Sequence, residues 1–291
     1  MLKRFLPVVC LMLMLVLAIA TVARAETVVI PQSSLVPSTT YYTDLIGGGI
    51  GSPILMTGGG NGHIPGQARN DDGFSGPINL GFTLNFFGTN YTQFWANNNG
   101  NISFGDGISA FTPTGPTGVD QPIISPFFAD VDTRNLASGV MTLRTDIPNQ
   151  IIVTWDMVGY FGEHADKLNS FQLVLRGPGF SVPAGEGQIG FFYKSMQWET
   201  GDASGGNGGF GGFPAAVGFG NGLGDAQVLQ GSQANGISTV VSNNHIWFNL
   251  QGGVPTPIPP PTGVPEPTSL LLLGGGLIAM AGYLRKRKRI L

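Results

Sequence analysis

Residues 94–104 read FWANNNGNISF, and this stretch decides the fold class. Both ends are apolar and aromatic, which is typical of β-strands, whereas the centre, Asn97–Gly100, holds residue types that tolerate the positive φ of a tight turn. The pattern predicts a β-hairpin over 94–104. A hairpin needs neighbouring strands to bury its apolar side, so further strands are expected on either side of it.

Strand signals recur along the chain. Apolar and polar residues alternate in Phe82–Phe86, so one face of this strand is expected to be buried. Further strands are predicted at 140–145, 151–158, 170–175, 188–198, 215–219 and 245–250. No amphipathic helix is predicted between these segments. The sequence therefore predicts an all-β domain, an antiparallel β-sandwich-like fold with long glycine-rich loops.

The first 25 residues predict a secretory signal peptide in the form of an apolar helix. Lys3 and Arg4 precede an apolar run over 5–20, and Ala23 and Ala25 offer small residues for cleavage. Cys10, the only cysteine of the chain, lies inside this run. Once the signal is removed, no disulfide can form, so the exported domain depends on its core or on bound ions.

The last 28 residues contain three elements in a fixed order: a polar tetrad, an apolar run over 269–284 and a basic end. The tetrad is Val264, Pro265, Glu266 and Pro267, and the basic residues are Arg285, Lys286, Arg287, Lys288 and Arg289. The run has 16 residues, fewer than the roughly 20 of an ordinary spanning helix. We expect a short transmembrane helix whose basic residues reach the cytoplasmic interface.

These three elements together resemble the PEP-CTERM sorting signal of Gram-negative bacteria. The resemblance implies recognition by an exosortase, a membrane enzyme similar to a transpeptidase, with cleavage near the tetrad. Signal peptidase would act at the other end of the chain. The implied localisation is an inner-membrane precursor and then the cell surface or extracellular matrix. The alternative is an ordinary single-pass anchor that is never cleaved.

The composition of the rest of the chain indicates its segment boundaries, and its net charge excludes one class of partner. The chain has 14 Lys and Arg and 17 Asp and Glu; eight of the basic residues and one acidic residue lie in the terminal segments. Residues 26–265 therefore carry six basic and 16 acidic residues, a net charge of −10. Such a surface would repel nucleic acid. We predict a glycine-rich segment at 26–70, a domain at 71–250 and a proline-rich stalk at 251–263.

Within 71–250, several motifs follow one another in a characteristic order. They include Asp71-Asp72-Gly73, Asn97–Gly105, Pro126–Asp132, Phe171–Leu175 and Gly190–Tyr193. In this order they resemble the nidogen-like (NIDO) extracellular domain. The most specific motif is PFFADVD at 126–132, where the family often has Trp in place of its second Phe. The resemblance implies a domain of extracellular matrix and adhesion proteins without established catalytic activity.

Asp130 and Asp132 are the candidate metal ligands. They occupy alternate positions at a predicted strand end, so both carboxylates are expected to point the same way. Calcium accepts such hard oxygen ligands outside the cell. The alternative is a solvated loop in which the two aspartates cap turns. Asp71-Asp72-Gly73 is a weaker candidate because this sequence is common in turns.

No catalytic motif is present. His63, His164 and His245 are too far apart for a zinc site, and neither a nucleophile elbow nor a phosphate-binding loop occurs. We therefore expect a non-catalytic surface or matrix protein with a structural or adhesion role associated with exopolysaccharide or biofilm, bound to polysaccharide or to a surface protein. No cofactor other than calcium is expected.

Two other classes stay open. A carbohydrate-binding module would stack sugars on exposed aromatic rings, but the four tryptophans lie on predicted strands and most are expected in the core. These are Trp95, Trp155, Trp198 and Trp247. A hydrolase of matrix polysaccharide would need two close carboxylates in a cleft, one with a raised pKa. Binding to glycans and activity on polysaccharide distinguish these classes.

Overall fold

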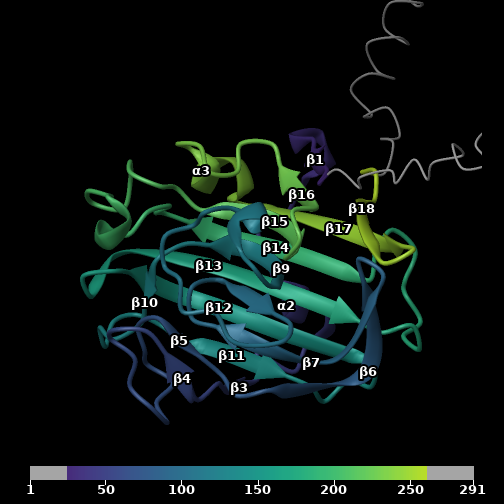
Figure 1. Ribbon diagram of the computed structural model, residues 1–291, viewed down its shortest axis with the longest axis horizontal. Helices are drawn as coiled ribbons and strands as arrows, with labels where there is room; N and C mark the ends of the chain where they lie inside the picture. Colours follow the sequence, from purple (N-terminus) through teal and green to yellow (C-terminus); the bar gives the residue numbers. More distant parts are fainter. Residues whose placement is uncertain (1–24, 261–291) are drawn as a thin grey trace, which may run out of the picture.

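The strands form two β-sheets that pack face to face (Figure 1). Side chains alternate along each strand, so one face of each sheet is directed into the core between them. The computed structural model describes residues 25–260. The first sheet contains β1 (Thr27–Ile30), β4 (Gly58–Gly59), β5 (Gly73–Phe74), β6 (Ile78–Phe86), β7 (Thr89–Asn97), β8 (Asn101–Ser103), β9 (Pro122–Phe128), β15 (Ala216–Asn221) and β16 (Ala226–Leu229). Its order is β1-β16-β15-β9-β8-β7-β5-β4, with β6 paired to β7.

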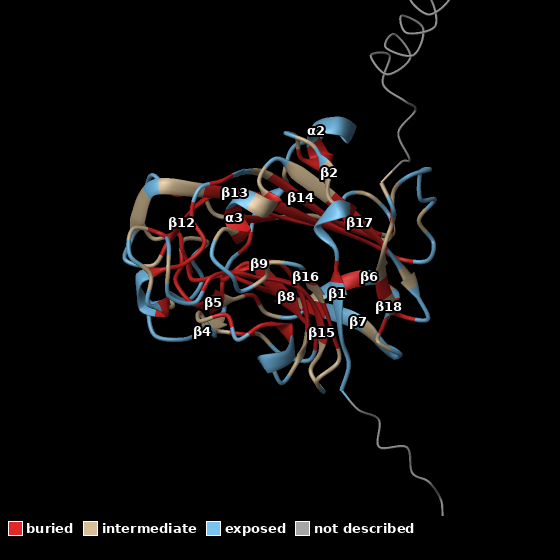
Figure 2. Ribbon diagram, turned by 90° about the horizontal axis from the view of Figure 1, so that it is seen from above, coloured by how far each residue is buried: buried red, intermediate tan, exposed pale blue. Residues whose placement is uncertain are grey.

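The second sheet carries the longest strands. It contains β2 (Val36–Pro37), β3 (Ser52–Pro53), β10 (Val131–Asp132), β11 (Met141–Arg144), β12 (Gln150–Tyr160), β13 (His164–Arg176), β14 (Ile189–Met196), β17 (Asn244–Gln251) and β18 (Val254–Pro257). Its order is β18-β17-β14-β13-β12-β11-β3, with β10 on β12 and β2 on β17. Figure 2 shows the buried residues, in red, where β13, β14 and β17 face β8, β9 and β15.

The predicted hairpin is formed by β7 and β8. Trp95 pairs with Ser103, and Asn97 pairs with Asn101. Gly100 has a φ of +78°, and a Cβ at this position would collide with the carbonyl oxygen of Phe127. The turn therefore requires glycine both for its backbone conformation and for its close approach to the neighbouring strand.

The centre of the second sheet is buried on both faces. On β12, Val153 and Trp155 point into the core between the sheets, whereas Ile152 belongs to a second cluster on the outer face. That cluster includes Tyr41 and Tyr42, which begin the short helix α2 (Tyr42–Ile46). Burial on both faces explains why these strands read as continuous apolar runs.

The segment before residue 71 takes part in both sheets, which differs from the predicted loops. Strand β1 pairs in parallel with β16, and β2 pairs with β17. The glycines from Gly47 onward indicated loops, but β1 and β2 precede these glycines and pair with strands far along the chain. The other short helical elements are α3 (Ile237–Val241) and the 3-10 turns Gln32–Ser34, Pro116–Gly118 and Asp202–Ser204.

The start of the predicted stalk is also part of the fold. Strand β18 pairs with β17 at the edge of the second sheet, where Pro255 and Pro257 can be accommodated. The predicted signal helix, apart from Ala25, and the predicted transmembrane helix of the tail lie outside the described residues. Between residues 25 and 260, no helix is long and apolar enough to cross a membrane.

Candidate functional site

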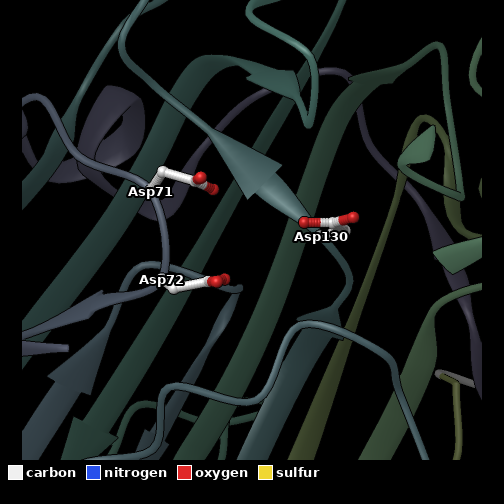
Figure 3. A group of neighbouring side chains, drawn as sticks. All are labelled: Asp71, Asp72 and Asp130. Atoms are coloured by element: carbon white, nitrogen blue, oxygen red, sulfur yellow. The ribbon is translucent and has the colours of Figure 1, made fainter. Parts of the chain in front are cut away.

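Three buried aspartates from two distant segments of the chain meet in one place (Figure 3). Asp71 and Asp72 precede β5, and Asp130 lies between β9 and β10. One carboxylate oxygen of each residue lies within 4.8 Å of those of the other two. The three side chains are only 2%, 5% and 0% exposed, respectively. We call Asp71, Asp72 and Asp130 the acidic cluster.

Asp72 is fixed by the turn that carries it. Its φ is +56°, in the left-handed region that aspartate tolerates better than most residues. Its carbonyl oxygen accepts a hydrogen bond from the Gly60 N–H at 3.0 Å, and its Oδ1 accepts one from Asn99 Nδ2 at 2.8 Å. Asn99 belongs to the β7–β8 turn, so the hairpin positions one member of the cluster.

Asp130 is fixed by its backbone but not by its side chain. The Phe161 N–H donates to the Asp130 carbonyl oxygen at 3.0 Å. Gly201 packs directly on the carboxylate, where a Cβ would lie 2.5 Å from Asp130 Oδ2. Neither carboxylate oxygen of Asp130 accepts a hydrogen bond within the described part of the chain. A carboxylate that is fully buried in this way has lost its hydration, and only the nearby Ser204 hydroxyl acts to lower its pKa again.

Asp132 has a different environment, although we expected it to point the same way as Asp130. Strand β9 ends at Phe128, and the Val131 N–H donates to the Ala129 carbonyl oxygen at 2.9 Å, which makes a three-residue turn centred on Asp130. The turn breaks the alternation on which the expectation was based. Asp132 therefore lies outside the acidic cluster.

The Asp132 carboxylate is well satisfied. Its oxygens accept hydrogen bonds from Arg134 Nε at 2.9 Å and from Arg134 Nη2 at 2.6 Å, and from the backbone N–H groups of Arg134 and Glu163, both at 2.9 Å. Arg134 Nη2 also lies 3.1 Å from Asp71 Oδ2. This bidentate pair orients the guanidinium between Asp132 and one edge of the acidic cluster.

Burial dominates the electrostatics of the cluster. It raises the pKa of Asp71 to about 7 and that of Asp130 to about 8, and the neighbouring carboxylates add to both shifts. The pKa of Asp72 is also raised, mainly by burial. With Asp132 included, four carboxylates share the single guanidinium of Arg134. Fully ionised, the group would carry a net charge of −3, which a low-dielectric site does not tolerate unaided.

Neutral oxygens without partners lie on the segments around the cluster. Asn98 Oδ1 and Thr200 Oγ1 are buried and lack hydrogen bonds within residues 25–260, as does Asp71 Oδ1. The amide nitrogen of Asn98 donates to the Val131 carbonyl oxygen, next to Asp130, at 2.5 Å. Thr200 precedes the glycine that packs on Asp130. Unpartnered buried polar atoms are uncommon in folded proteins, so several near one site need an explanation.

Three of the four tryptophans are in the core. Trp155 and Trp198 are fully buried and donate to the carbonyl oxygens of Asn98 and Val158 at 3.1 and 3.0 Å. Trp247 is 5% exposed, whereas Trp95 is half-buried. Most of the candidate sugar-stacking rings are therefore covered by protein.

The remaining candidates do not join the cluster as a group. His63 contacts Asn70 Oδ1 at 3.1 Å, His164 contacts Asp202 at 2.9 Å, and His245 stacks on Phe192, so each of the three histidines has its own partner. The sorting tetrad 264–267 and the basic residues 285–289 lie outside the described residues.

Comparisons with known proteins agree with the motifs. The model of the NIDO-related family matches residues 55–254, and that of the PEP-CTERM protein-sorting motif matches residues 263–288. Over 181 residues the chain is 33% identical to alpha-tectorin of Mus musculus, and it is 32% identical to that of Homo sapiens over the same length. Each alignment covers 52% of this chain and 8% of the relative. No solved structure matches.

The family match covers nearly all of the sandwich and includes the three residues of the acidic cluster. The sorting motif implies an exported protein that an exosortase recognises at the membrane. The chain therefore belongs to the NIDO-related family and carries a PEP-CTERM sorting motif at its C-terminal end.

Proposed function

We propose that this chain is a non-catalytic structural protein of the cell surface or extracellular matrix of a Gram-negative bacterium, with an adhesion role associated with exopolysaccharide. The sorting motif supports a route through an inner-membrane precursor that the exosortase cleaves. Membership of the NIDO-related family supports a domain that works by binding. The partner would be an extracellular polysaccharide or a surface protein.

The burial of the acidic cluster carries the non-catalytic part of the proposal. A glycoside hydrolase needs two carboxylates on either side of the bond that it cleaves, and one of them keeps a raised pKa. Asp71 and Asp130 have raised pKa values, but they are 2% and 0% exposed. This burial keeps both carboxylates away from a sugar chain, which supports a role in the fold.

The surface grooves also favour a structural role over a carbohydrate-binding module. One groove of about 340 Å³ lies between β6 and the β11–β12 turn, and another of about 300 Å³ lies beside the β6–β7 hairpin. Neither of these two grooves is lined by an aromatic side chain. Sugar-binding sites commonly use such rings as stacking surfaces.

Two experiments test the proposal: the phenotype of a deletion strain, and assays of activity and binding with the purified full chain. Deletion should weaken cohesion of the matrix or attachment of cells, and the gene in trans should restore it. Release of reducing ends from the organism's own polysaccharide by the purified chain would contradict the non-catalytic proposal. Saturable binding on a glycan array, without a matrix phenotype, would favour the carbohydrate-binding module instead.

A further inference from the structure

We propose that Asp71, Asp72 and Asp130 bind one calcium ion, which joins the segment before β5 to the β9–β10 junction. In Figure 3 the side chains of Asp71 and Asp72 extend from one segment towards the side on which Asp130 lies. Three oxygens within 4.8 Å of one another fit around a single ion whose oxygen ligands lie about 2.3–2.6 Å away.

Charge gives the first argument for a cation. Arg134 forms a bidentate pair with Asp132. Of the three aspartates in the acidic cluster, its guanidinium contacts only Asp71, at 3.1 Å. Within residues 25–260, Asp72 and Asp130 form no ion pair. A divalent ion would reduce the net charge of the four carboxylates and one guanidinium from −3 to −1.

Unpartnered neutral oxygens give a second and independent argument. Asn98 and Thr200 are each 1% exposed, and their side-chain oxygens have no hydrogen-bond partner in the described chain. Asn98 is bonded to the residue after Asp130, and Thr200 adjoins the glycine that packs on the Asp130 carboxylate. An amide oxygen and a hydroxyl are neutral ligands that calcium accepts when carboxylates supply the charge.

The donor types select calcium among the common metal ions. All of the candidate ligands are oxygens, which excludes a thiolate site of the kind that zinc or copper prefers. Magnesium demands a regular octahedron and usually keeps several waters, whereas calcium accepts six to eight ligands in irregular arrangements. A deeply buried site built from distant segments of the chain suits the less demanding ion.

The ion would act on the fold and not on a substrate. The acidic cluster joins the turn at 71–73, the β7–β8 turn through Asn99, and the loop at 200–201 that covers Asp130. Binding to the folded state alone stabilises it by mass action. This inference concerns the domain itself and does not depend on the proposed adhesion role.

Calorimetric titration of the chelator-stripped full chain with calcium chloride, in detergent at pH 7.5, tests the site. We expect one ion per chain with a dissociation constant of about 10⁻⁴–10⁻³ M, the range of extracellular calcium modules. Asp130→Asn should weaken binding at least ~10-fold, because ligand charge sets calcium affinity. Asp166→Asn is the matched control, since this exposed carboxylate pairs with Lys167 at 2.7 Å.

Two results would overturn the proposal. The first is no saturable binding to the wild-type chain up to about ten times the weaker limit of that range, which would leave Arg134 and protons as the only counter-charges. The second is unchanged affinity in both Asp130→Asn and Asp72→Asn, which would place the ion elsewhere. Because the wild-type titration stands alone, the test remains decisive even if one variant does not fold.

Discussion

In chelator, the domain should lose stability as the pH rises from about 4 to 8. Folding raises the pKa of Asp71 to about 7 and that of Asp130 to about 8, above the 3.8 of a free side chain. The folded state therefore holds protons that the unfolded state releases. The stabilisation is fully present below the unfolded pKa and is lost as the pH rises through the folded pKa.

The size of this effect follows from the same shifts. One pKa unit corresponds to 1.36 kcal/mol, so raising Asp71 from 3.8 to about 7 gives about 4 kcal/mol. The same step for Asp130, from 3.8 to about 8, gives about 6 kcal/mol. The two groups repel each other and titrate together, so about 10 kcal/mol is an upper limit. A loss of several kcal/mol is large beside a typical total stability of about 5–15 kcal/mol.

Other carboxylates act in a different pH window. The pKa values of Asp44 and Asp166 are lowered. For Asp44, burial raises the pKa but the hydrogen bond and charge of Lys194 outweigh it, and for Asp166 the hydrogen bond from Lys167 is the largest cause. Their contributions are present above the unfolded pKa and are lost as the pH falls through the folded one, below about pH 4. Between pH 5 and 8 the acidic cluster titrates together with His245. Burial lowers the pKa of His245, so its contribution to stability rises with pH and opposes the larger fall expected from the cluster.

Urea unfolding followed by tryptophan fluorescence, at pH 5, 6, 7 and 8 in EDTA and in calcium, measures the effect. In EDTA the unfolding free energy should fall with pH, and Asp71→Asn with Asp130→Asn should flatten the profile. In calcium the fall should disappear or reverse, because the ion replaces the protons. A flat or rising profile in EDTA would refute the reasoning, since it would mean that the carboxylates are hydrated or paired.

Three further predictions concern substitutions elsewhere in the chain. Glu199→Gln should lower the unfolding free energy by about 3 kcal/mol in urea titrations, because this 1%-exposed carboxylate accepts hydrogen bonds from the backbone and hydroxyl groups at the start of α3; an unchanged midpoint would mean that the amide serves equally well. Gly100→Ala should destabilise the domain more than Gly88→Ala, since both glycines have positive φ but only Gly100 lies against the Phe127 carbonyl group; equal melting temperatures would contradict the collision. Replacing residues 265–267 with alanine should retain the precursor in the inner membrane, as cell fractionation would show, and normal delivery to the surface would mean that the tetrad is not the signal.

Local patterns predicted the strands well because they depend on neighbouring residues. The β7–β8 hairpin, its Asn-rich turn and the alternation in β6 could all be found in short windows of sequence. The order of motifs also predicted the family, because these motifs are spread over the whole domain. Short windows cannot predict pairing between distant segments. The parallel pairing of Thr27–Ile30 with Ala226–Leu229 is an example.

The candidate site shows the same limit more sharply. Asp130 was identified from its motif, but its expected partner was the residue two positions later. The partners in the structure, Asp71 and Asp72, lie in a sequence that also suits an ordinary turn. The one available signal was that both segments belong to the same series of family motifs. The turn centred on Asp130, which directs Asp132 to Arg134, left no mark in the sequence pattern.

The choice of carboxylates in the cluster carries the strongest physical implication. Asn98 and Asn99 show that amides can make the hydrogen bonds of these turns, and an amide at 130 would be buried at far lower cost than a carboxylate. Without an ion, three buried aspartates only weaken a domain that has no disulfide to support it. With an ion they become a crosslink among segments that are distant in the chain. Stability outside the cell would then depend on calcium, which is a dependence that neither disulfides nor an apolar core would provide.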